Sequence, residues 1–498
     1  MDIQSLLVVL VAALSFAATD APQKSAAQHE LYSAHWSRAA ELYREILRAD
    51  PSQGDAWDAL VRALIEAHRA DDAYAAADDA MKNAPETAGA YTARGRALYR
   101  QGHLAEAEAS FLKAFGLNEK YADALAGLAR VRRGVAKFKM AEDLDMMAYR
   151  AAPDDPELIL SWANTLKGAQ HVAALRRALA IFDPETREAR SLRAHIASDV
   201  ALGDRHARVL ESPYREYELN LVNILSGPRQ SRGVGLRVRF NDSYEATLLL
   251  DTGAGGLSLS RKAAKKAGFE ALEEEGTEVH GVGDRNRPNS FRYLASEVRD
   301  GDLILRNYPV AIFDAAKDSD ADGLIGGDVF ARFLVQLDWP HMKLRLLPYP
   351  GVTTPSEDAR DSDPPANGFQ RIYSVGHLLI PTLINDEPAS LFLIDSGASM
   401  NLVNATAARN ATKVRGDHST VLRGVQGRVD SVSRADRVRL TFANFRQDNT
   451  DMLAMDLSHA SDELGIEVAG VLGMPVLSQL VVTIDYRNAA IRLERGRR

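Results

Sequence analysis

Apolar and polar positions follow two different patterns along this chain, and the change falls at about Arg208. Before it, large and small apolar residues recur at the long spacing of paired helices. After it, apolar and polar residues alternate, as in Gly235–Phe240, and a period of two is typical of a half-buried strand. The pattern therefore predicts a helical first half and a β-rich second half.

The helical half contains an internal repeat. Pro51 and Pro85 lie 34 residues apart, Pro153 follows after twice that interval, and Glu119 occupies the intermediate position. Residue size recurs with the same period: the large positions are Trp57, Tyr91 and Leu125, and the small ones are Ala73, Ala107, Ala141, Ala80, Ala114 and Ala148. Agreement of period and residue type predicts stacked helix pairs, in which small residues allow close helix contact.

This pattern resembles the tetratricopeptide repeat (TPR), and we assign residues 20–205 to a TPR-like solenoid. Stacked helix pairs form a concave surface that commonly holds a peptide or a protein partner. We therefore expect a partner on the concave face. The alternative is that the helices only support the second half of the chain.

The β-rich half contains one unit twice. An apolar strand runs into Asp251-Thr252-Gly253-Ala254, and a similar strand runs into Asp395-Ser396-Gly397-Ala398, 144 residues later. Three further segments recur in the same order at nearly the same separation: His280–Gly283 with Arg423–Gly427, Gly323–Gly326 with Gly470–Gly473, and Leu337–Trp339 with Ile484–Tyr486. A nearly constant offset over four segments indicates two copies of one lobe.

Each copy resembles a lobe of a retropepsin-type aspartic peptidase, and the pair resembles a fused, single-chain form of that dimer. The resemblance implies lobe 1 at residues 210–350, a linker at 351–368 that is rich in Pro, Asp and Ser, and lobe 2 at 369–498. The expected fold class is multidomain, with an all-α solenoid followed by an all-β bilobal domain. An open alternative lets each lobe pair with its counterpart in another chain.

The residues that follow the two apolar strands are those that peptide hydrolysis requires. Two carboxylates held close together cannot both ionise cheaply, so Asp251 and Asp395 are expected to share a proton. One then activates a water and the other donates a proton to the peptide carbonyl. Gly253 and Gly397 permit a tight turn. The resemblance implies that Thr252 and Ser396 lock the two turns across the interface.

Two other sets of residues are assigned from the repeated segments. Gly281, Val282 and Gly283 fall where the family has a flap that closes over substrate, as do Gly424 and Val425 in the second copy, although ordinary hairpin turns remain an alternative. The absence of Tyr between Thr277 and Ser290 favours the retropepsin form over the pepsin-like form. The strands that pack behind the catalytic turns are expected at Leu324, Ile325 and Gly326 and at Val471, Leu472 and Gly473.

A calcium loop is the competing interpretation of Asp318-Ser-Asp320-Ala-Asp322-Gly323, because oxygens at positions 1, 3 and 5 and Gly at position 6 open such a loop. Position 12 is Val329, whereas a calcium loop has Glu there. The preceding segment, Leu303–Phe313, is expected to form two short strands, although a calcium loop follows a helix. We therefore expect a solvated loop at Asp318–Asp322, and neither a metal nor a cofactor.

Composition limits the remaining classes of function. A net charge of −8 gives no indication of a nucleic-acid partner, and the absence of Cys excludes disulfides, thiolate metal sites and a Cys nucleophile. The apolar run from Leu6 to about Ala18 fits a secretory signal at residues 1–19, despite Asp2 in place of a basic residue. We expect export to a bacterial periplasm or to the outside, without a further membrane span. An uncleaved N-terminal helix is the alternative.

These patterns together predict an exported aspartic endopeptidase that acts on peptides or unfolded proteins and has a helical-repeat module for recruitment. A protein that clasps peptides without cutting them is the alternative from another class. The presence of both Asp251 and Asp395 disfavours it, because apposed carboxylates are costly to hold without a use.

Overall fold

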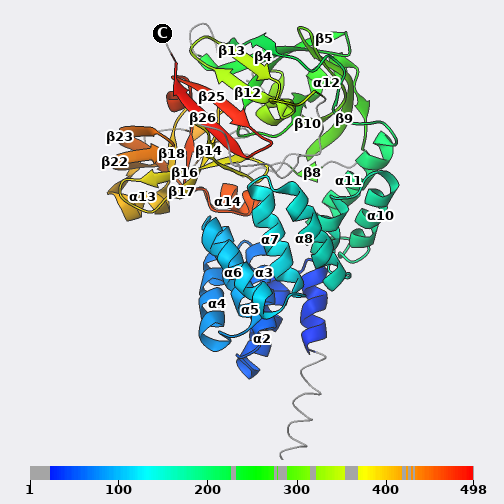
Figure 1. The fold of residues 1–498 in the computed structure, drawn as a ribbon, viewed down its shortest axis with the longest axis vertical. Helices are drawn as coiled ribbons and strands as arrows, with labels where there is room; N and C mark the ends of the chain where they lie inside the picture. The colour runs from blue at the N-terminus through cyan, green and yellow to red at the C-terminus, as the bar shows by residue number, and fades with distance from the viewer. Residues whose placement is uncertain are drawn as a thin grey trace, which may run out of the picture. The chain divides into compact units, whose positions relative to one another are not determined.

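The structure is a computed structural model. It describes residues 23–225, 231–273, 277–278, 289–313, 321–353, 368–417, 422–423, 428–429 and 432–496. The chain divides into two compact units, one with residues up to Val131 and Ala141–Arg193, the other with Arg132–Met140 and Ala194–Arg498. The division falls inside a helix near residue 194 rather than at the expected boundary near 205. Figure 1 shows the helices and the strands in separate parts of the fold.

The first unit is built from helix pairs, as the 34-residue period predicts. The bounds are α2 (Trp36–Ala49), α3 (Gly54–Glu66), α4 (Ala70–Asn83), α5 (Ala88–Arg100), α6 (Leu104–Leu117), α7 (Ala122–Gly134), α8 (Phe138–Ala151), α9 (Pro156–Ala163), α10 (Gly168–Leu179) and α11 (Arg187–Leu202). The repeated small residues are fully or almost fully buried: Ala73, Ala80, Ala107, Ala114, Ala141 and Ala148. Burial of these side chains is consistent with close packing within each pair.

A line of arginines runs through this unit, and Arg62 and Arg96 are buried, with relative exposures of 4% and 7%. Arg62, Arg96 and Arg130 lie 34 residues apart on α3, α5 and α7. Arg96 bonds to Asp123 and Arg130 bonds to Glu157, in each case an acid 27 residues further on. The charges therefore repeat with the same period as the helices, and Arg96 and Arg130 each join one helix pair to the next.

Arg62 makes contacts over a longer sequence separation, including one with Asp155, 93 positions away. The Arg62 guanidinium donates two hydrogen bonds to the Asp155 carboxylate, one of them 2.8 Å long. Both side chains are almost fully buried, with relative exposures of 4% and 3%. Asp155 also accepts from the Glu157 backbone N–H and so caps the start of α9. Arg62 therefore links α3 to the N-terminus of α9.

Lobe 1 of the second unit is a mixed sheet. Its strands are β1 (Val209–Leu210), β3 (Val222–Leu225), β4 (Ser231–Phe240), β5 (Tyr244–Asp251), β6 (Leu257–Ser260), β7 (Glu270–Ala271), β8 (Thr277–Glu278), β9 (Asn289–Asp300), β10 (Leu303–Phe313) and β11 (Gly323–Gly326). The short helix α12 (Arg261–Ala267) ends at Gly268, which has a φ of 66°. Buried apolar side chains of the strands form its core.

The segment Leu303–Phe313 corrects one expectation from the sequence. It forms one strand, β10, rather than two. Along β9, Arg306 pairs with Glu297 and Tyr308 pairs with Ala295, so pairing continues on both sides of Asn307. Asn307 takes a positive φ of 53° and absorbs the local irregularity.

Lobe 2 repeats this arrangement. Its strands are β15 (Tyr373–Ser374), β16 (Leu378–Ile384), β17 (Ser390–Ile394), β18 (Leu402–Asn404), β19 (Val414–Asp417), β22 (Val432–Phe442), β23 (Phe445–Met455) and β24 (Gly470–Leu472), with β20 (Leu422–Arg423) and β21 (Arg428–Val429) as a separate pair. The short helix α13 (Ala405–Ala411) follows β18 as α12 follows β6. The two lobes therefore share one topology around the strands that lead into Asp251 and Asp395.

A third sheet joins the lobes. Its strands are β14 (Gln370–Arg371), β26 (Ala490–Arg495), β25 (Leu480–Asp485), β12 (Leu334–Asp338), β13 (Lys343–Leu347) and β2 (Tyr217–Asn220), in that order across the sheet. The central contact is between lobes, because β12 of lobe 1 pairs antiparallel with β25 of lobe 2. Figure 1 shows the red strands β25 and β26 beside β12. In this structure the two lobes of a single chain therefore pair with each other.

In the part of the chain that the structure describes, no helix combines the length and the apolar character that crossing a membrane requires. The expected signal segment lies outside the described residues.

Candidate active site

The two Asp-Thr/Ser-Gly turns, which begin at Asp251 and Asp395, are placed by equivalent strands. Strand β5 ends at Asp251, and β17 ends at Ile394, directly before Asp395. Strand β11 runs parallel to β5, with Ile325 opposite Leu250, and β24 runs parallel to β17, with Leu472 opposite Ile394. The expected second-motif strands, Leu324–Gly326 and Val471–Gly473, therefore lie beside the strands that carry the two aspartates.

Hydroxyl groups tie the two turns together across the lobe interface. The Thr252 hydroxyl donates to the Ile394 carbonyl at 2.8 Å and accepts from the Ser396 backbone N–H at 3.0 Å. The Ser396 hydroxyl donates to the Leu250 carbonyl at 2.7 Å and accepts from the Thr252 backbone N–H at 3.0 Å. Both residues are buried, with relative exposures of 4% and 2%. This reciprocal set is the lock between the turns that the sequence predicts at Thr252 and Ser396.

The glycines of the turns allow the two carboxyl groups to approach. A Cβ added to Gly253 would lie 2.6 Å from the Asp395 Cγ, and one added to Gly397 would lie 2.5 Å from an Asp251 carboxylate oxygen. No side chain fits at either position. Each carboxyl group therefore packs on the backbone of the opposite turn.

Backbone N–H groups orient both aspartates, and burial controls their protonation. Gly253 N–H donates to Asp251 at 2.8 Å, and Gly397 N–H donates to Asp395 at 2.8 Å. Burial raises the pKa of Asp251 well above its usual range, and the charge of Asp395 raises it further. Burial also raises the pKa of Asp395, although a hydrogen bond with Asp251 opposes this increase. The two groups form a partly buried pair suited to holding one shared proton.

Comparison with known families agrees with this geometry. Residues 236–329 and 380–476 match the sequence profile of a family described as aspartyl protease, one match in each lobe. The β-rich unit is an aspartic-peptidase-like domain. No curated protein matches the chain.

Solved structures resemble the helical unit. A thermophilic TPR protein from Thermus thermophilus has 19% identity and a TM-score of 0.29, covering 36% of this chain and 98% of its own. PilF of Pseudomonas aeruginosa has 20% identity and a TM-score of 0.24, covering 36% and 82%. MamA has 20% identity and a TM-score of 0.21, covering 29% and 88%. The helix pairs and the 34-residue period carry the assignment of a TPR-like region.

The expected flap residues, Gly281, Val282, Gly283, Gly424 and Val425, lie outside the described residues. The structure therefore does not test them.

The aspartate that ends the possible calcium loop has another role. Asp322 accepts a hydrogen bond from the Tyr244 hydroxyl at 2.8 Å and one from the Thr247 backbone N–H at 3.0 Å. Both carboxylate oxygens are thus used within lobe 1, so Asp322 is part of the lobe rather than of a solvated loop. Asp318 and Asp320 lie outside the described residues. Among described residues 210–496, no three His, Asp or Glu side chains are grouped closely enough to hold a metal ion.

Sequence reasoning missed three polar residues beside the catalytic turns: Asp328, His377 and Tyr486. Asp328 accepts a hydrogen bond from the Gly256 backbone N–H at 2.8 Å. Burial lowers the pKa of the His377 ring, while a hydrogen bond with the Gly253 backbone and the charges of Asp395 and Asp328 oppose this. A Cβ on Gly327 would lie 2.3 Å from the Tyr486 hydroxyl. The repeated pattern does not mark these residues, because the other lobe has Gly233, Pro475 and Trp339 at the equivalent positions.

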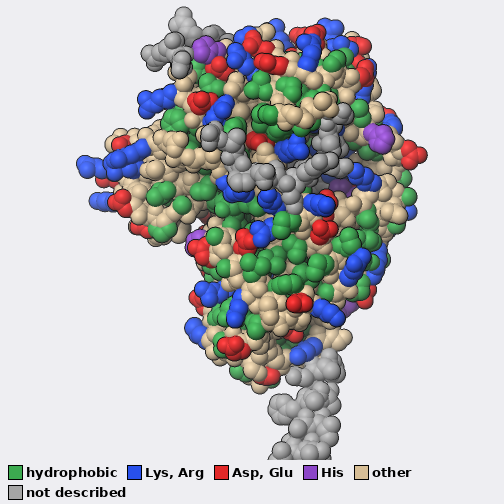
Figure 2. Space-filling model, viewed as in Figure 1, with side chains coloured by type: hydrophobic (Ala, Val, Ile, Leu, Met, Phe, Trp, Pro, Cys, Tyr) green, Lys and Arg blue, Asp and Glu red, His purple; other side chains and the backbone are tan. Residues whose placement is uncertain are grey.

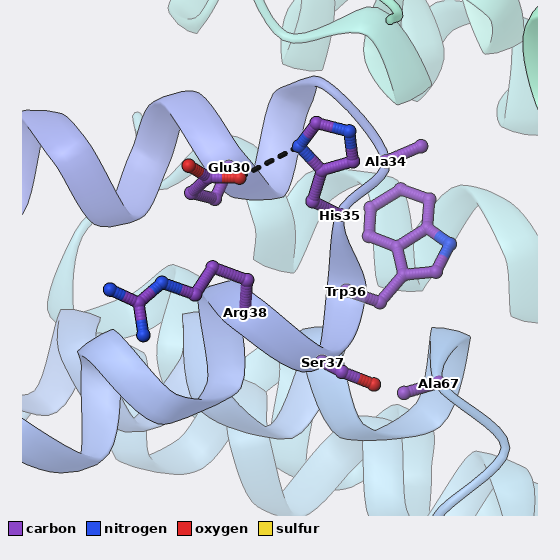
Figure 3. Close-up of a pocket in the computed structure, with 7 residues that line it drawn as sticks. All are labelled: Glu30, Ala34, His35, Trp36, Ser37, Arg38 and Ala67. Atoms are coloured by element: carbon purple, nitrogen blue, oxygen red, sulfur yellow. Dashed lines mark hydrogen bonds and ion pairs between the residues drawn. The ribbon is translucent and has the colours of Figure 1, made fainter. Parts of the chain in front are cut away.

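The surface of the helical unit has one shallow hollow and several exposed apolar side chains. A shallow hollow of about 560 Å³ is lined by Glu30, Ala34, His35, Trp36, Ser37, Arg38 and Ala67. Figure 3 shows the hydrogen bond between Glu30 and His35 at its edge, 2.7 Å long. Elsewhere in the unit, Leu112, Leu117 and Met147 are exposed by 47%, 41% and 43%. Figure 2 shows hydrophobic side chains between charged ones over the helices.

Proposed function

We propose that this protein is an aspartic endopeptidase that hydrolyses peptide bonds with a water activated between Asp251 and Asp395. The observation that carries the proposal is the paired geometry of the two turns, in which each carboxyl group packs on the opposite glycine and hydroxyls cross-link the turns. Two buried carboxyl groups with raised pKa values can hold one proton and one negative charge together.

The chemistry follows from that shared proton. The ionised carboxylate takes a proton from the water as its oxygen bonds to the peptide carbon, and the protonated carboxyl group donates its proton to the carbonyl oxygen. The product is a neutral diol. The carboxyl group that took its proton from the water then donates that proton to the amide nitrogen, while the other, now ionised, takes a proton from one hydroxyl of the diol. The carbon–nitrogen bond breaks, an amine and a carboxylic acid are released, and the pair again holds one proton. Gly253 and Gly397 N–H groups keep both carboxyl groups oriented during these steps.

Cleavage of an unfolded protein across pH tests this function. The full chain is compared with Asp251→Asn and Asp395→Asn, each assayed alone. We expect either substitution to lower kcat by at least about 1,000-fold, because one carboxyl group cannot act as both acid and base. Wild-type rates in either variant would contradict the shared dyad.

The alternative function is peptide binding without hydrolysis. It would be favoured if the wild-type chain cut no peptide at any pH but bound unfolded protein, with unchanged affinity in Asp251→Asn. The presence of both carboxyl groups in this paired geometry within one chain favours hydrolysis, because their burial raises both pKa values at a cost in stability.

We further propose that the TPR-like unit recruits the substrate or a partner protein. Its exposed Leu112, Leu117 and Met147 side chains offer apolar contacts of the kind that an unfolded chain can make. In the full-length Asp251→Asn variant, a photo-reactive unfolded protein should form cross-links to residues 36–179, detected by mass spectrometry. Cross-links confined to residues 210–496 would contradict recruitment by the helices.

Export remains part of the proposal, on the basis of the apolar run at Leu6–Ala18. A chain expressed from its own start codon in a bacterium should be found in the periplasm or the medium, with a mature N-terminus near residue 20. Retention of residues 1–19 in a cytoplasmic fraction would contradict export.

A further inference from the structure

The turn that begins at Asp251 has a carboxylate beside it that the turn of lobe 2 lacks. Gly326 lies opposite Asp251 where β11 pairs with β5, and Asp328 follows two residues later in the short 3₁₀ helix η1 (Gly327–Phe330). Adjacent strands lie about 4.8 Å apart and two residues span at most about 7 Å, so the Cα atoms of Asp251 and Asp328 are within about 12 Å of each other. Asp328 therefore lies close to the dyad without being part of it.

The backbone of that turn holds one oxygen of the Asp328 carboxylate. Its Oδ1 atom accepts a hydrogen bond from the Gly256 N–H at 2.8 Å. A Cβ added to the exposed Gly255 would lie 3.9 Å from Oδ2, and one added to Gly256 would meet nothing within 4 Å. Among the described residues, nothing donates a hydrogen bond to Oδ2, and no Lys or Arg pairs with Asp328. The Oδ2 atom therefore borders open space beside two glycines.

Lobe 2 has a different surface at the equivalent positions. The pairing of β6 with β11 and of β18 with β24 aligns Gly256 with Met400, whose side chain is 39% exposed. Asp328 is aligned with Pro475, two residues after Gly473. Lobe 1 therefore offers an open position with a negative charge beside its turn, whereas lobe 2 offers an exposed apolar side chain.

We propose that Asp328 is a specificity-determining residue that binds a basic side chain of the peptide substrate, on the lobe 1 side of the cleaved bond. This proposal rests on the proposed function, because it requires a peptide that lies extended across the dyad. An extended chain rises about 3.3 Å per residue, so a separation of about 12 Å places the basic residue within about four positions of the cleaved bond.

The chemistry of the position selects a cation. Gly255 and Gly256 leave room for a long Lys or Arg side chain, whose charged end can donate a hydrogen bond to the Oδ2 atom of Asp328. A hydrogen bond between two charged groups is stronger than one between neutral groups. The charge of Asp328 acts on the His377 ring, but burial lowers the pKa of that ring, so it is mainly neutral at pH 7. A basic substrate residue would therefore supply the positive charge that the chain itself does not place there.

Cleavage of matched peptides tests the proposal. In a peptide that the wild-type chain cuts, each of four positions on either side of the bond receives Lys or norleucine, and separately Arg or citrulline. The members of each pair have nearly the same shape and differ in charge. We expect kcat/KM to favour the charged member by about tenfold at one or more positions on one side of the bond, and Asp328→Asn to remove this preference. Asn can still accept the Gly256 N–H, so the turn should be retained.

Asp302→Asn is the matched control, because that carboxylate of lobe 1 is 80% exposed and pairs with exposed Arg215. It should leave the preference unchanged. Added salt should weaken the preference of the wild-type chain, a measurement that leaves Asp328 in place and stays valid if its variant does not fold. The proposal would be overturned by the absence of a preference at every position, by a preference that survives Asp328→Asn, or by one that salt does not change.

Binding without turnover separates this proposal from the proposed function. Fluorescently labelled Lys and norleucine peptides are titrated with the full-length Asp251→Asn variant, and anisotropy gives their Kd values. The Lys peptide should bind about tenfold more tightly, and adding Asp328→Asn should make the two Kd values equal. A wild-type chain that cuts no peptide would disprove the proposed function, whereas equal Kd values in Asp251→Asn alone would disprove the role of Asp328.

Discussion

Asp300, at the end of β9, shows how burial acts on a carboxyl group without a partner. Its Oδ2 atom is buried and has no hydrogen-bond partner among the described residues. Burial, with a smaller contribution from Glu245, raises the pKa of Asp300 to about 7 from 3.8. Because the pKa is higher in the folded protein than in the unfolded chain, proton binding by Asp300 stabilises the folded state, and this contribution is fully present below about pH 4. It is lost as the pH rises to about 7.

Asp300→Asn should therefore stabilise lobe 1 at pH 8 and change little at pH 4. The upper limit of the gain is about 4 kcal/mol, from about 1.4 kcal/mol per pH unit between the unfolded and folded pKa values. Thermal unfolding midpoints at both pH values measure it. The matched control is Asp302→Asn, whose side chain is 80% exposed and pairs only with exposed Arg215, so it should have little effect. An equal gain at pH 4 and pH 8 would contradict the assigned titration.

At the scale of single helices, close packing around Phe111 depends on two glycines. A Cβ on Gly95 of α5 would lie 2.6 Å from the Phe111 ring, and one on Gly127 of α7 would lie 2.4 Å from it. Phe111 itself, on α6, is 1% exposed. The neighbouring backbones therefore approach the ring too closely to accept even a methyl group.

Gly95→Ala should destabilise the helical unit by about 1–3 kcal/mol through overpacking, although Ala is the better helix former. Gly116→Ala in α6 is the matched control, because its Cβ would meet nothing within 4 Å and the change should be neutral or stabilising. Denaturant unfolding followed by circular dichroism measures both. Combining Gly95→Ala with Phe111→Leu should recover part of the loss. A variant at Gly95 as stable as the one at Gly116 would contradict the packing argument.

The hydrogen bonds between the turns that begin at Asp251 and Asp395 also stabilise the β-rich unit. Ser396→Ala removes the hydroxyl that donates to the Leu250 carbonyl and accepts from the Thr252 N–H, leaving two buried groups without a partner. We expect a loss of about 1–3 kcal/mol in the stability of the β-rich unit. Ser396→Thr should restore it, because Thr252 holds the equivalent position in lobe 1. Equal melting temperatures for the Ala and Thr variants would contradict the role of the hydroxyl.

The two copies of the lobe also show how much of this structure can be predicted from the sequence. The near-constant offset between the copies predicts both catalytic turns and the strands β11 and β24 beside them, because an apolar strand that ends in Asp-Thr/Ser-Gly is a local pattern. The same offset gives no indication of His377, since its counterpart is Gly233. The positive φ at Asn307 within one continuous strand is also hidden, because a break in alternation resembles the end of a strand.

At the scale of the whole helical unit, stability depends on contacts that no local pattern reveals. Arg62 on α3 meets Asp155 and Glu157, 93 and 95 residues away, and the Arg62 and Asp155 side chains are almost fully buried. In a repeat array each helix pair contacts mainly its neighbours, so unfolding can start at one end. A buried contact across several pairs opposes such separate unfolding.

Arg62→Met should therefore cost about 3–5 kcal/mol, because it leaves the Asp155 carboxylate buried without its cation. It should also split the unfolding of the helical unit into two steps, with the helices after residue 155 unfolding first. Differential scanning calorimetry of the full chain, with circular dichroism at 222 nm, measures both effects.

Arg62→Met with Asp155→Asn should recover much of the loss, since Asn can still cap α9 and carries no charge. Arg38→Ala removes a pair whose two side chains are 57% and 60% exposed, and should cost well under about 1 kcal/mol. A loss at Arg62 no larger than at Arg38, or a single unchanged transition, would show that the arginine line does not hold the array together.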